Sequence, residues 1–369
     1  MGSIIFALVR KEFLALLKDK RSRFVIVVPP IVQLLIFGFA ASFDLNHVPF
    51  AVYNEDRSAA SRALVARFEG SPNFDLVQHI DADGGIAPAI DRRHVVMVLH
   101  IGPNFSEQLL LGRTAPAQVI IDGRNSNTAL IVLNYARTIV TNFSQDWARD
   151  HGRPPPPAIV TARAWFNPNL ESRWFIVPGI VGLLTLVVSL LVTALSVARE
   201  REAGSFDQLL VTPLRPSAIL LGKALPGIII GTVEASLIIA IAVYGFGVPL
   251  QGDLLALYLG LLLFLLSSIG IGLMISSLAA TQQQALLGAF LFLVPAVILS
   301  GFATPIANMP QAVQLITYLD PLRYFLVVIR GVFLEGSTTG ALLSQYWPMA
   351  VIGLATLSSA AWLFRHRMY

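Results

Sequence analysis

Six stretches of apolar residues, each about as long as a bilayer-spanning helix, dominate this chain. A helix needs roughly 20 apolar residues to cross the hydrocarbon core of a bilayer. Charged residues make up only 13% of the chain, whereas ordinary soluble domains have about 25%. These features predict an all-α polytopic membrane domain with six transmembrane helices. The stretches cover residues 24–43, 174–197, 218–245, 254–278, 285–302 and 346–364.

The basic residues predict an orientation for this membrane domain. All four lysines lie before the first stretch or just past the loop that follows the second one, at Lys11, Lys18, Lys20 and Lys223. Arginines are also frequent in the 199–215 loop and in the C-terminal tail. Because short loops rich in Lys and Arg stay in the cytoplasm, and because six is an even number of spans, both termini are expected to be cytoplasmic.

Residues 1–23 are basic and amphipathic, with apolar side chains at helical spacing opposite Arg10, Lys11 and Lys18. This pattern predicts a helix that lies in the cytoplasmic membrane interface. A cleaved signal peptide is the competing interpretation. It is disfavoured because the 24–43 stretch has the length of a true span and no clear small-residue cleavage site follows it.

Residues 44–173 have a different character, with frequent charges and short apolar runs. Strands are expected at 49–53, 74–77, 94–100 and 118–121, and helices at 58–68, 104–111 and 126–150. This alternation predicts an inserted α/β domain. A long domain crosses a membrane largely regardless of its charge, so an extracytoplasmic location agrees with the predicted topology.

The 303–345 segment is apolar only in short runs, and Arg323 and Arg330 interrupt it. Its apolar run from Tyr324 to Leu334 is too short to form another span, so we expect a re-entrant or interfacial helical hairpin on the outer side. Residues 174–369 therefore comprise five transmembrane helices together with this hairpin.

The sequence carries no signature of an enzyme. It has no cysteine, no phosphate-binding loop, no H-E-x-x-H and no G-x-S-x-G. The pI is about 9.5, but the basic residues do not form one patch, so nucleic acid is not an expected partner. His94 and His100 lie six apart, and surface or core histidines are a better interpretation than metal ligands. No metal site and no catalytic residue are predicted.

The loop after the second stretch is the most informative segment. Ser205 and Gln208 form a capping box, so a short helix is expected over 204–213. It presents Phe206, Leu209 and Leu210 on one side and ends at Pro213. On these residues alone, a linking turn and a docking helix are equally supported.

This loop resembles the coupling-helix region of ABC type-2 exporter permeases, where E-R-E-x-G-T-x-E-Q-L-L-V-T-P precedes G-K-x-x-P. Ser205 and Asp207 replace the family's Thr and Glu, and Ser217 stands where an acidic residue is common. The resemblance implies that the 204–213 helix docks on an ATPase. The implied docking residues are Glu200, Arg201, Glu202, Gly204, Ser205, Phe206, Gln208, Leu209, Leu210 and Pro213.

A second block resembles the family's outer segment after the fifth span. Asp320 departs from it, since an apolar residue is more typical there. The resemblance covers nearly the whole chain and is closest to the subgroup with a large extracytoplasmic domain, often linked to drug efflux. The residues that carry this second block include Pro305, Tyr318, Pro321, Arg323 and Tyr324.

The resemblance implies the permease subunit of an exporter in the bacterial plasma (inner) membrane. It would move bulky or amphipathic substrates such as drugs, lipids or glycans. Its partners would be ABC ATPase subunits, a second permease copy or paralogue, membrane lipid, and in some systems a periplasmic adaptor. ATP and Mg²⁺ would bind only to the ATPase, and this chain would hold no cofactor. Two alternatives remain: a membrane-anchored sensor or assembly factor with an extracytoplasmic ligand-binding domain, and an ion-coupled carrier, which would need more than one intramembrane charge.

Glu234 is the one acidic residue expected deep in a span. It lies eleven residues past Lys223, which is about 16 Å along a helix. A carboxylate there costs roughly 2.5–3.5 kcal/mol on insertion scales, so it should face protein or water. It is either a group on the substrate path or a buried packing group hydrogen-bonded to a neighbouring helix.

Overall fold

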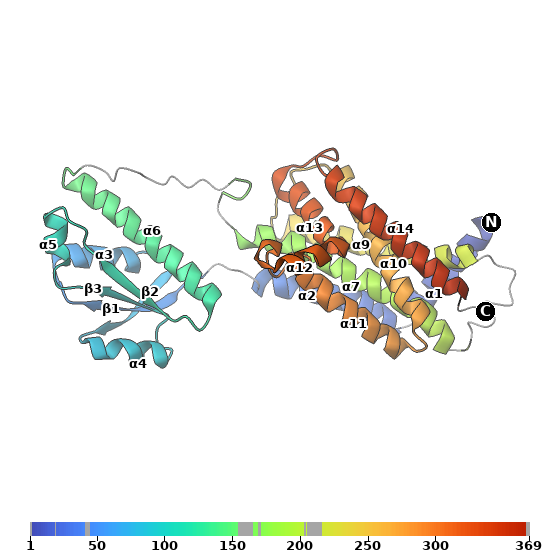
Figure 1. Cartoon of the computed structure of the whole chain (residues 1–369), viewed down its shortest axis with the longest axis horizontal. Coiled ribbons are helices and arrows are strands. Elements are labelled where there is room, and N and C mark those ends of the chain that lie inside the picture. The colour runs from blue at the N-terminus through green and yellow to red at the C-terminus, as the bar shows by residue number, and fades with distance from the viewer. Residues whose placement is uncertain are drawn as a thin grey trace. The chain divides into compact units, whose positions relative to one another are not determined.

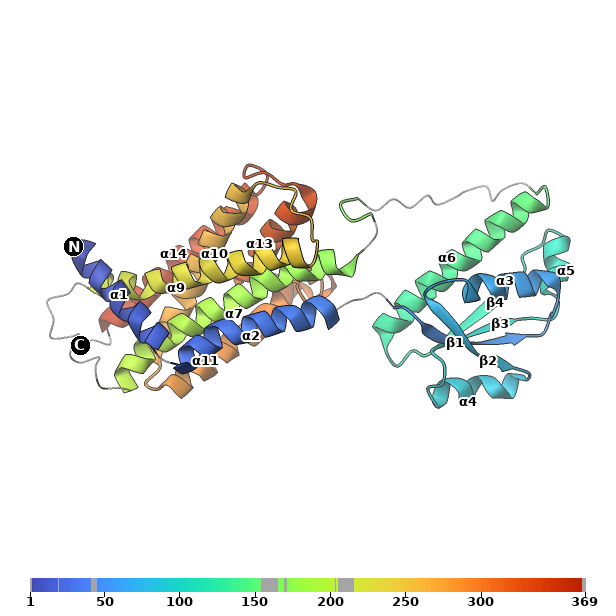
Figure 2. The ribbon, with the colours of Figure 1, turned by 180° about the vertical axis from the view of Figure 1, so that it is seen from behind.

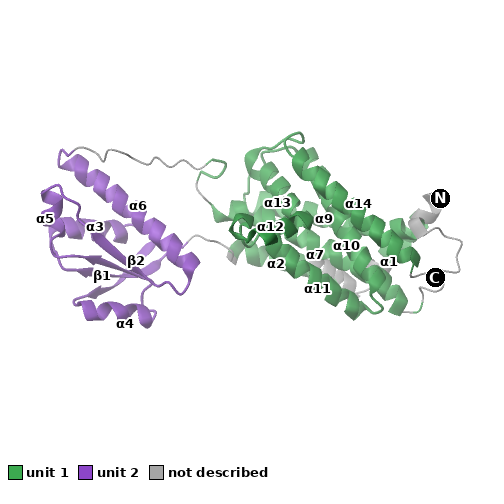
Figure 3. Cartoon of the chain, in the orientation of Figure 1, with its two compact units in different colours: residues 1–42, 164–369 green, residues 43–163 purple. Residues whose placement is uncertain are grey.

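The computed structural model describes residues 2–18, 20–40, 45–153, 165–168, 171–202, 204 and 216–366. The chain forms two compact units (Figures 1 and 3). Unit 1 comprises Met1–Ser42 and Ala164–Tyr369, and unit 2 comprises Phe43–Arg163.

All regular elements in the described part of unit 1 are helices. Two of its helices, α9 and α13, continue into single π-helical turns, η2 (Ile241–Gly245) and η5 (Gly331–Glu335). Short 3-10 turns, η3 (Ile306–Asn308) and η4 (Thr317–Leu319), flank α12. The α-helices are α1 (Gly2–Lys18), α2 (Lys20–Ala40), α7 (Ser172–Glu202), α9 (Pro216–Ala240), α10 (Leu254–Leu278), α11 (Gln282–Leu299), α12 (Gln311–Ile316), α13 (Pro321–Arg330) and α14 (Leu343–His366).

Within the described residues, five helices are long and apolar enough to cross a membrane. They are α7, α9 with η2, α10, α11 and α14, and they confirm five of the six predicted spans. The predicted outer hairpin is a pair of short helices, Gln311–Leu319 and Pro321–Glu335, bent by 83° against each other. Asp320 causes part of this bend, because its carboxylate caps α13 by accepting a hydrogen bond from the Leu322 N–H at 3.0 Å.

The N-terminal region differs from the prediction. The amphipathic helix α1 ends at Lys18 instead of continuing to residue 23, and Lys20, Arg21 and Arg23 belong to the first turns of α2. The apolar part of α2 is Val28–Phe39, which is shorter than the other five spans. These basic residues and the Pro29–Pro30 pair explain why α2 is the weakest of the six predicted spans.

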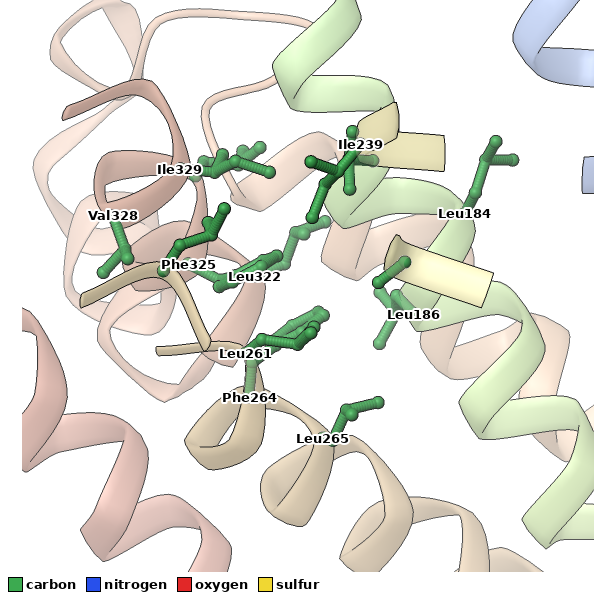
Figure 4. Close-up of a cluster of buried hydrophobic side chains, with 14 of the residues drawn as sticks. Leu184, Leu186, Ile239, Leu261, Phe264, Leu265, Leu322, Phe325, Val328 and Ile329 are labelled. Carbon is green, nitrogen blue, oxygen red and sulfur yellow. The ribbon is translucent and has the colours of Figure 1, made fainter. Parts of the chain in front are cut away.

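The core of unit 1 forms around α7, which contacts α2, α9, α10, α11 and α13. Figure 4 shows side chains from α7, α9, α10 and α13 meeting in one apolar cluster. Within it, the rings of Phe264 and Phe325 stack with centroids 4.5 Å apart. In the most apolar 18-residue stretch of α7, 78% of the residues are buried, whereas 17% are buried in the corresponding stretch of α11. Helix α7 is therefore the central element, and α11 presents most of its apolar surface outward.

Helices α7 and α10 approach each other closely at Gly272. A Cβ atom at this position would lie 2.0 Å from Thr193 Oγ1 and 3.0 Å from the Leu190 carbonyl oxygen. Thr193 in turn donates a hydrogen bond to the Ser189 carbonyl oxygen in its own helix. The missing side chain of Gly272 thus permits this crossing.

Both ends of unit 1 can be recognised in Figures 1 and 2. The start of α1, the end of α7 and the end of α14 lie together at one end, whereas the end of α2 and the start of α7 lie at the other. The chain therefore leaves unit 1 for unit 2 and returns from it at the same end.

Unit 2 contains a four-stranded sheet of order β2-β1-β3-β4. Strands β1 (Val48–Asn54), β2 (Phe74–Ile80) and β3 (Met97–Ile101) are parallel, and β4 (Ala117–Ile121) is antiparallel to β3. Helices α3 (Ala59–Glu69), α5 (Phe105–Leu110) and α6 (Ser126–Asp150) share one core with the sheet. Helix α4 (Ile86–Asp91) packs on the opposite face (Figure 1).

The four strands and three of these four helices coincide with the predicted ones to within three residues at every end. The largest difference between a predicted and an observed start is that of β3, which begins at Met97 instead of residue 94. His94 therefore lies in the preceding loop. Helix α4 was not predicted, because Pro88 and the glycines before it are typical of a turn.

Candidate functional site

A cluster of charged side chains lies where α1, α7 and α9 meet. Its centre is the ammonium group of Lys223, whose side chain is only 3% exposed. Lys223 Nζ lies 2.6 Å from Glu200 Oε2 and 2.9 Å from Glu12 Oε1, and it is 3.3 Å from Ser196 Oγ. Lys11 pairs with the other oxygen of Glu200 at 2.7 Å. A lysine is rarely buried unless it is paired, and here two carboxylates hold it in place.

Gly222 allows α1 to reach this cluster. A Cβ atom on Gly222 would lie 2.8 Å from Cβ of Leu8, so the two helices touch backbone to side chain next to Lys223. The amphipathic helix is thereby packed against α9 instead of lying free of the bundle.

Three consecutive charged residues at the end of α7, Glu200 to Glu202, contact different neighbouring helices. Glu200 faces α1 and α9 through the ion pairs above. Arg201 donates hydrogen bonds to the Ser277 and Ala279 carbonyl oxygens at the end of α10, at 2.8 and 3.1 Å. Glu202 accepts one from the Gln282 N–H at the start of α11, at 2.8 Å. These side chains connect the end of α7 to four neighbouring helices of the same chain.

Gly204 ends α7 in a left-handed conformation, with φ at +67°, and its N–H donates to the Arg201 carbonyl oxygen at 3.0 Å. Glycine adopts this conformation without the strain that a Cβ atom introduces. The rest of the predicted docking helix lies outside the described residues, namely Ser205, Phe206, Gln208, Leu209, Leu210 and Pro213.

The charged cluster joins the two helices, α7 and α9, between which residues 203–215 lie in the chain. Glu200 precedes residues 203–215 in the chain, Lys223 follows them, and the two side chains form an ion pair. The sequence did not predict Glu12 and Lys223 as site residues. The sequence feature that could have identified Glu12 and Lys223 is their opposite charge beside long apolar stretches, where an unpaired charge costs free energy.

The predicted outer residues also come together. The Arg323 guanidinium lies over the Tyr318 ring, 4.1 Å from its centroid, and hydrogen-bonds Thr317. The Tyr324 hydroxyl donates to the Tyr318 carbonyl oxygen at 2.9 Å, and Pro321 begins α13. These contacts stabilise the bend between α12 and α13. Pro305 lies apart from them, exposed before η3.

Glu234 lines a pocket of about 260 Å³ between α1, α2 and α9. All its other lining residues are apolar; they include Phe13, Pro30, Ile31, Ile230, Val233 and Leu237. Glu234 is only 8% exposed. Within the described part of the chain, neither carboxyl oxygen has a hydrogen-bond partner. The packing alternative expected a bond to a neighbouring helix, and none of the described helices supplies it.

The two histidines considered as metal ligands, His94 and His100, have ordinary environments. His94 is exposed, and the His100 ring hydrogen-bonds Glu55 at 2.7 Å and Gln118 at 3.1 Å. Burial alone would lower the pKa of His100, but these hydrogen bonds and the Glu55 charge outweigh it and raise the pKa above its usual 6.5. Among the residues that the structure describes, no group of three or more His, Asp or Glu side chains is arranged to bind a metal.

Comparison with known proteins gives a consistent result over nearly the whole chain. The family described as "ABC-2 family transporter protein" matches residues 20–363. The chain is 37% identical to the probable multidrug ABC transporter permease YbhR of Escherichia coli K12, over 99% of both chains. It is 35% identical to the probable multidrug ABC transporter permease YbhS of that strain, over 90% of this chain and 88% of YbhS. The inner membrane transport permease YhhJ of the same strain is 30% identical, over 98% of this chain and 96% of YhhJ.

Proposed function

This chain belongs to the ABC-2 transporter family as the permease subunit of an ABC exporter, and we propose that its charged cluster transmits the motion of a partner ATPase to the spans. As a permease it is not itself the ATPase, and membership of the family implies a separate ATPase subunit. ATP and Mg²⁺ are proposed to bind to that subunit alone.

The observation that carries this proposal is the ion pair between Glu200 and Lys223. The proposed docking helix, residues 204–213, lies between these two residues in the chain. Any displacement of the helix is therefore applied to α7 and α9 together, and through Glu12 and Lys11 to α1 as well. Arg201 and Glu202 extend the connection to α10 and α11. A rigid connection of this kind suits a mechanical coupling element better than a passive linker.

We further propose the topology in which both termini and residues 199–216 are cytoplasmic. The basic α1, the charged cluster and the basic end of α14 then lie at the cytoplasmic end of unit 1. Helix α2 serves as the sixth span, and the bent α12–α13 pair lies on the outer side as a re-entrant hairpin. The proposed location of unit 2 is extracytoplasmic, which is supported by the chain leaving unit 1 for it at the end opposite to the cluster.

The proposed cargo is a bulky or amphipathic molecule, and the proposed assembly has two permeases and two ATPases, with the second permease a copy or a paralogue. Two of the similar permeases are named as probable multidrug transporters, which supports drug-like substrates over other amphipathic classes. Glu234 is the proposed polar group on the path. A periplasmic adaptor is a proposed further partner. The sensor or assembly-factor alternative is not favoured, since the similar proteins are named as permeases.

The docking proposal is tested with Phe206→Ala and Leu209→Ala, which remove apolar contacts to the ATPase. Both variants should co-purify with less ATPase and lose stimulation of ATP hydrolysis, while the thermal stability of the chain is unchanged. Leu315→Ala is the matched control, because Leu315 is an exposed leucine on α12. ATPase binding and stimulation equal to those of the wild type would exclude the 204–213 segment as the docking site.

A further inference from the structure

The pocket around Glu234 joins an apolar wall to one polar group that lacks a partner. Both carboxyl oxygens are buried without a hydrogen bond from any described residue. Burial of a polar group without a hydrogen bond costs free energy, and native proteins satisfy nearly all such groups. An unsatisfied carboxyl that lines a pocket is therefore a candidate binding group for a ligand that brings a hydrogen-bond donor.

We propose that this pocket binds a lipophilic amine, with the ammonium N–H group donating to the Glu234 carboxylate and the apolar body packing against α1, α2 and α9. Glu234 is the one polar residue among the described lining residues, and a carboxylate can only accept hydrogen bonds. The ligand must then bring the donor, and a positive charge makes the hydrogen bond stronger. The lining is otherwise apolar, which selects an alkyl or aromatic body.

The size of the pocket restricts this ligand. A volume of about 260 Å³ lies just below the range of roughly 300–1,000 Å³ that is common for small-molecule sites. The pocket therefore holds one small ring system or a short chain with its amine, and a larger molecule would leave part of its body outside.

The pocket opens on the outer apolar surface of unit 1. Val233 and Leu237, which line it, are 65% and 48% exposed on α9. Glu234 lies near the middle of the α9 span, and Phe13 lines the pocket from α1, one residue past Glu12 of the charged cluster. A ligand dissolved in the lipid phase reaches the carboxyl from the side of the bundle without crossing the packed core around α7.

Only the role of the pocket as a substrate site rests on the proposed function, because binding of the amine to the pocket needs no ATPase. It is tested with the purified full-length chain in nanodiscs, without the ATPase. The probes are a radiolabelled lipophilic tertiary amine, its N-methylated quaternary analogue and its neutral carbon isostere. The tertiary amine donates an N–H group when protonated, whereas the other two probes have none.

Glu234→Gln is expected to weaken binding of the tertiary amine by about 10-fold or more, and binding of the neutral isostere by less than about 2-fold. The quaternary analogue should bind to the wild type about 10-fold more weakly than the tertiary amine, because it has no N–H group to donate. Asp253→Asn is the control for loss of a carboxylate, since Asp253 is exposed and only caps α10.

Ile230→Trp fills the pocket and should abolish binding of all three probes, whereas Leu291→Trp places the same ring on the exposed face of α11 and should leave binding unchanged. Equal affinity of the wild type for the tertiary amine and the isostere would overturn the proposal and indicate a site for any apolar chain, lipid included. Unchanged amine binding by Glu234→Gln would overturn it as well. A chain that binds the amine as described but supports no ATP-driven export upholds the pocket and overturns the proposed function.

Discussion

Replacement of Lys223 by methionine tests how much the charged cluster stabilises unit 1. The substitution keeps an unbranched side chain as far as Cε but leaves Glu12 and Glu200 without the ammonium group that lies 2.9 and 2.6 Å from them. Their side chains are only 12% and 11% exposed. Breaking a buried pair by removing one partner costs about 3–5 kcal/mol, because a buried charge is left uncompensated.

The expected cost for Lys223→Met lies at the lower end of this range, about 3 kcal/mol. Lys11 still compensates Glu200 at 2.7 Å, so Glu12 is the group left alone. At about 2–4 °C per kcal/mol for a unit of this size, the unfolding midpoint should fall by roughly 6–12 °C. Adding Glu12→Gln to Lys223→Met should restore much of this loss, since it removes the uncompensated charge.

The assay is thermal unfolding in nanodiscs, followed by tryptophan fluorescence at one fixed scan rate, because membrane proteins often unfold irreversibly. Lys11→Met is the matched control. Lys11 is 50% exposed and has one partner, so its loss should cost at most about 1 kcal/mol. The reasoning fails if Lys223→Met unfolds within about 3 °C of the wild type, or if Glu12→Gln lowers the stability of Lys223→Met further.

Three more predictions address the bundle, unit 2 and the topology. Gly272→Ala should destabilise unit 1 by about 1–3 kcal/mol, because the new Cβ atom would lie 2.0 Å from Thr193 Oγ1. The control is Gly340→Ala, which should not change the unfolding midpoint because a Cβ atom there would have no neighbour within 4 Å. Equal unfolding midpoints for the two variants would contradict the close crossing of α7 and α10. The raised pKa of His100 means that its protonated form stabilises unit 2 below about pH 6.5 and that this contribution is lost as the pH rises through the folded-state pKa. Hydrogen exchange of β3 and β4, corrected for the intrinsic rate, should show lower protection at pH 8 than at pH 6, and His100→Gln should remove this difference; a difference that persists in the variant rules out His100 as its source. A single cysteine introduced at Ser126 should react with an impermeant thiol reagent in intact cells, whereas one at Gln283 should react only after lysis. Only the introduced cysteine can react, because the chain has none of its own. The reverse labelling pattern would invert the proposed topology.

Regular elements of this chain could be predicted because their signals are local. The stretch at 254–278 coincides with α10, which has Asp253 as its N-cap and few features besides apolar length. The strands of unit 2 have the same advantage, since each is a short apolar run between turn residues. The division between α1 and α2 was missed because the basic residues at 20–23 continue the pattern of the preceding helix and do not mark its end.

The charged cluster and the pocket could not be predicted, because they depend on contacts between distant residues. Lys223 and Glu12 are 211 positions apart, and Lys11 and Glu200 are 189 apart. A sequence pattern shows that Glu200 is charged but not that it faces Lys223. Glu234 stood out through its depth in a span, whereas its lack of a partner and the apolar wall beside it are visible only in the fold.

The position of unit 2 in the chain has a consequence for biosynthesis. Helix α2 packs against α7, but roughly 130 residues separate their facing ends. At synthesis rates of about 5–20 residues per second, α2 waits roughly 7–26 seconds before its partner leaves the ribosome. During that time the segment with the shortest apolar part, Val28–Phe39, must hold its place without the bundle, while unit 2 is made and folded. The ribosome-bound chain is therefore most vulnerable to degradation or misinsertion at this stage, and a membrane chaperone that shields a lone helix would act here.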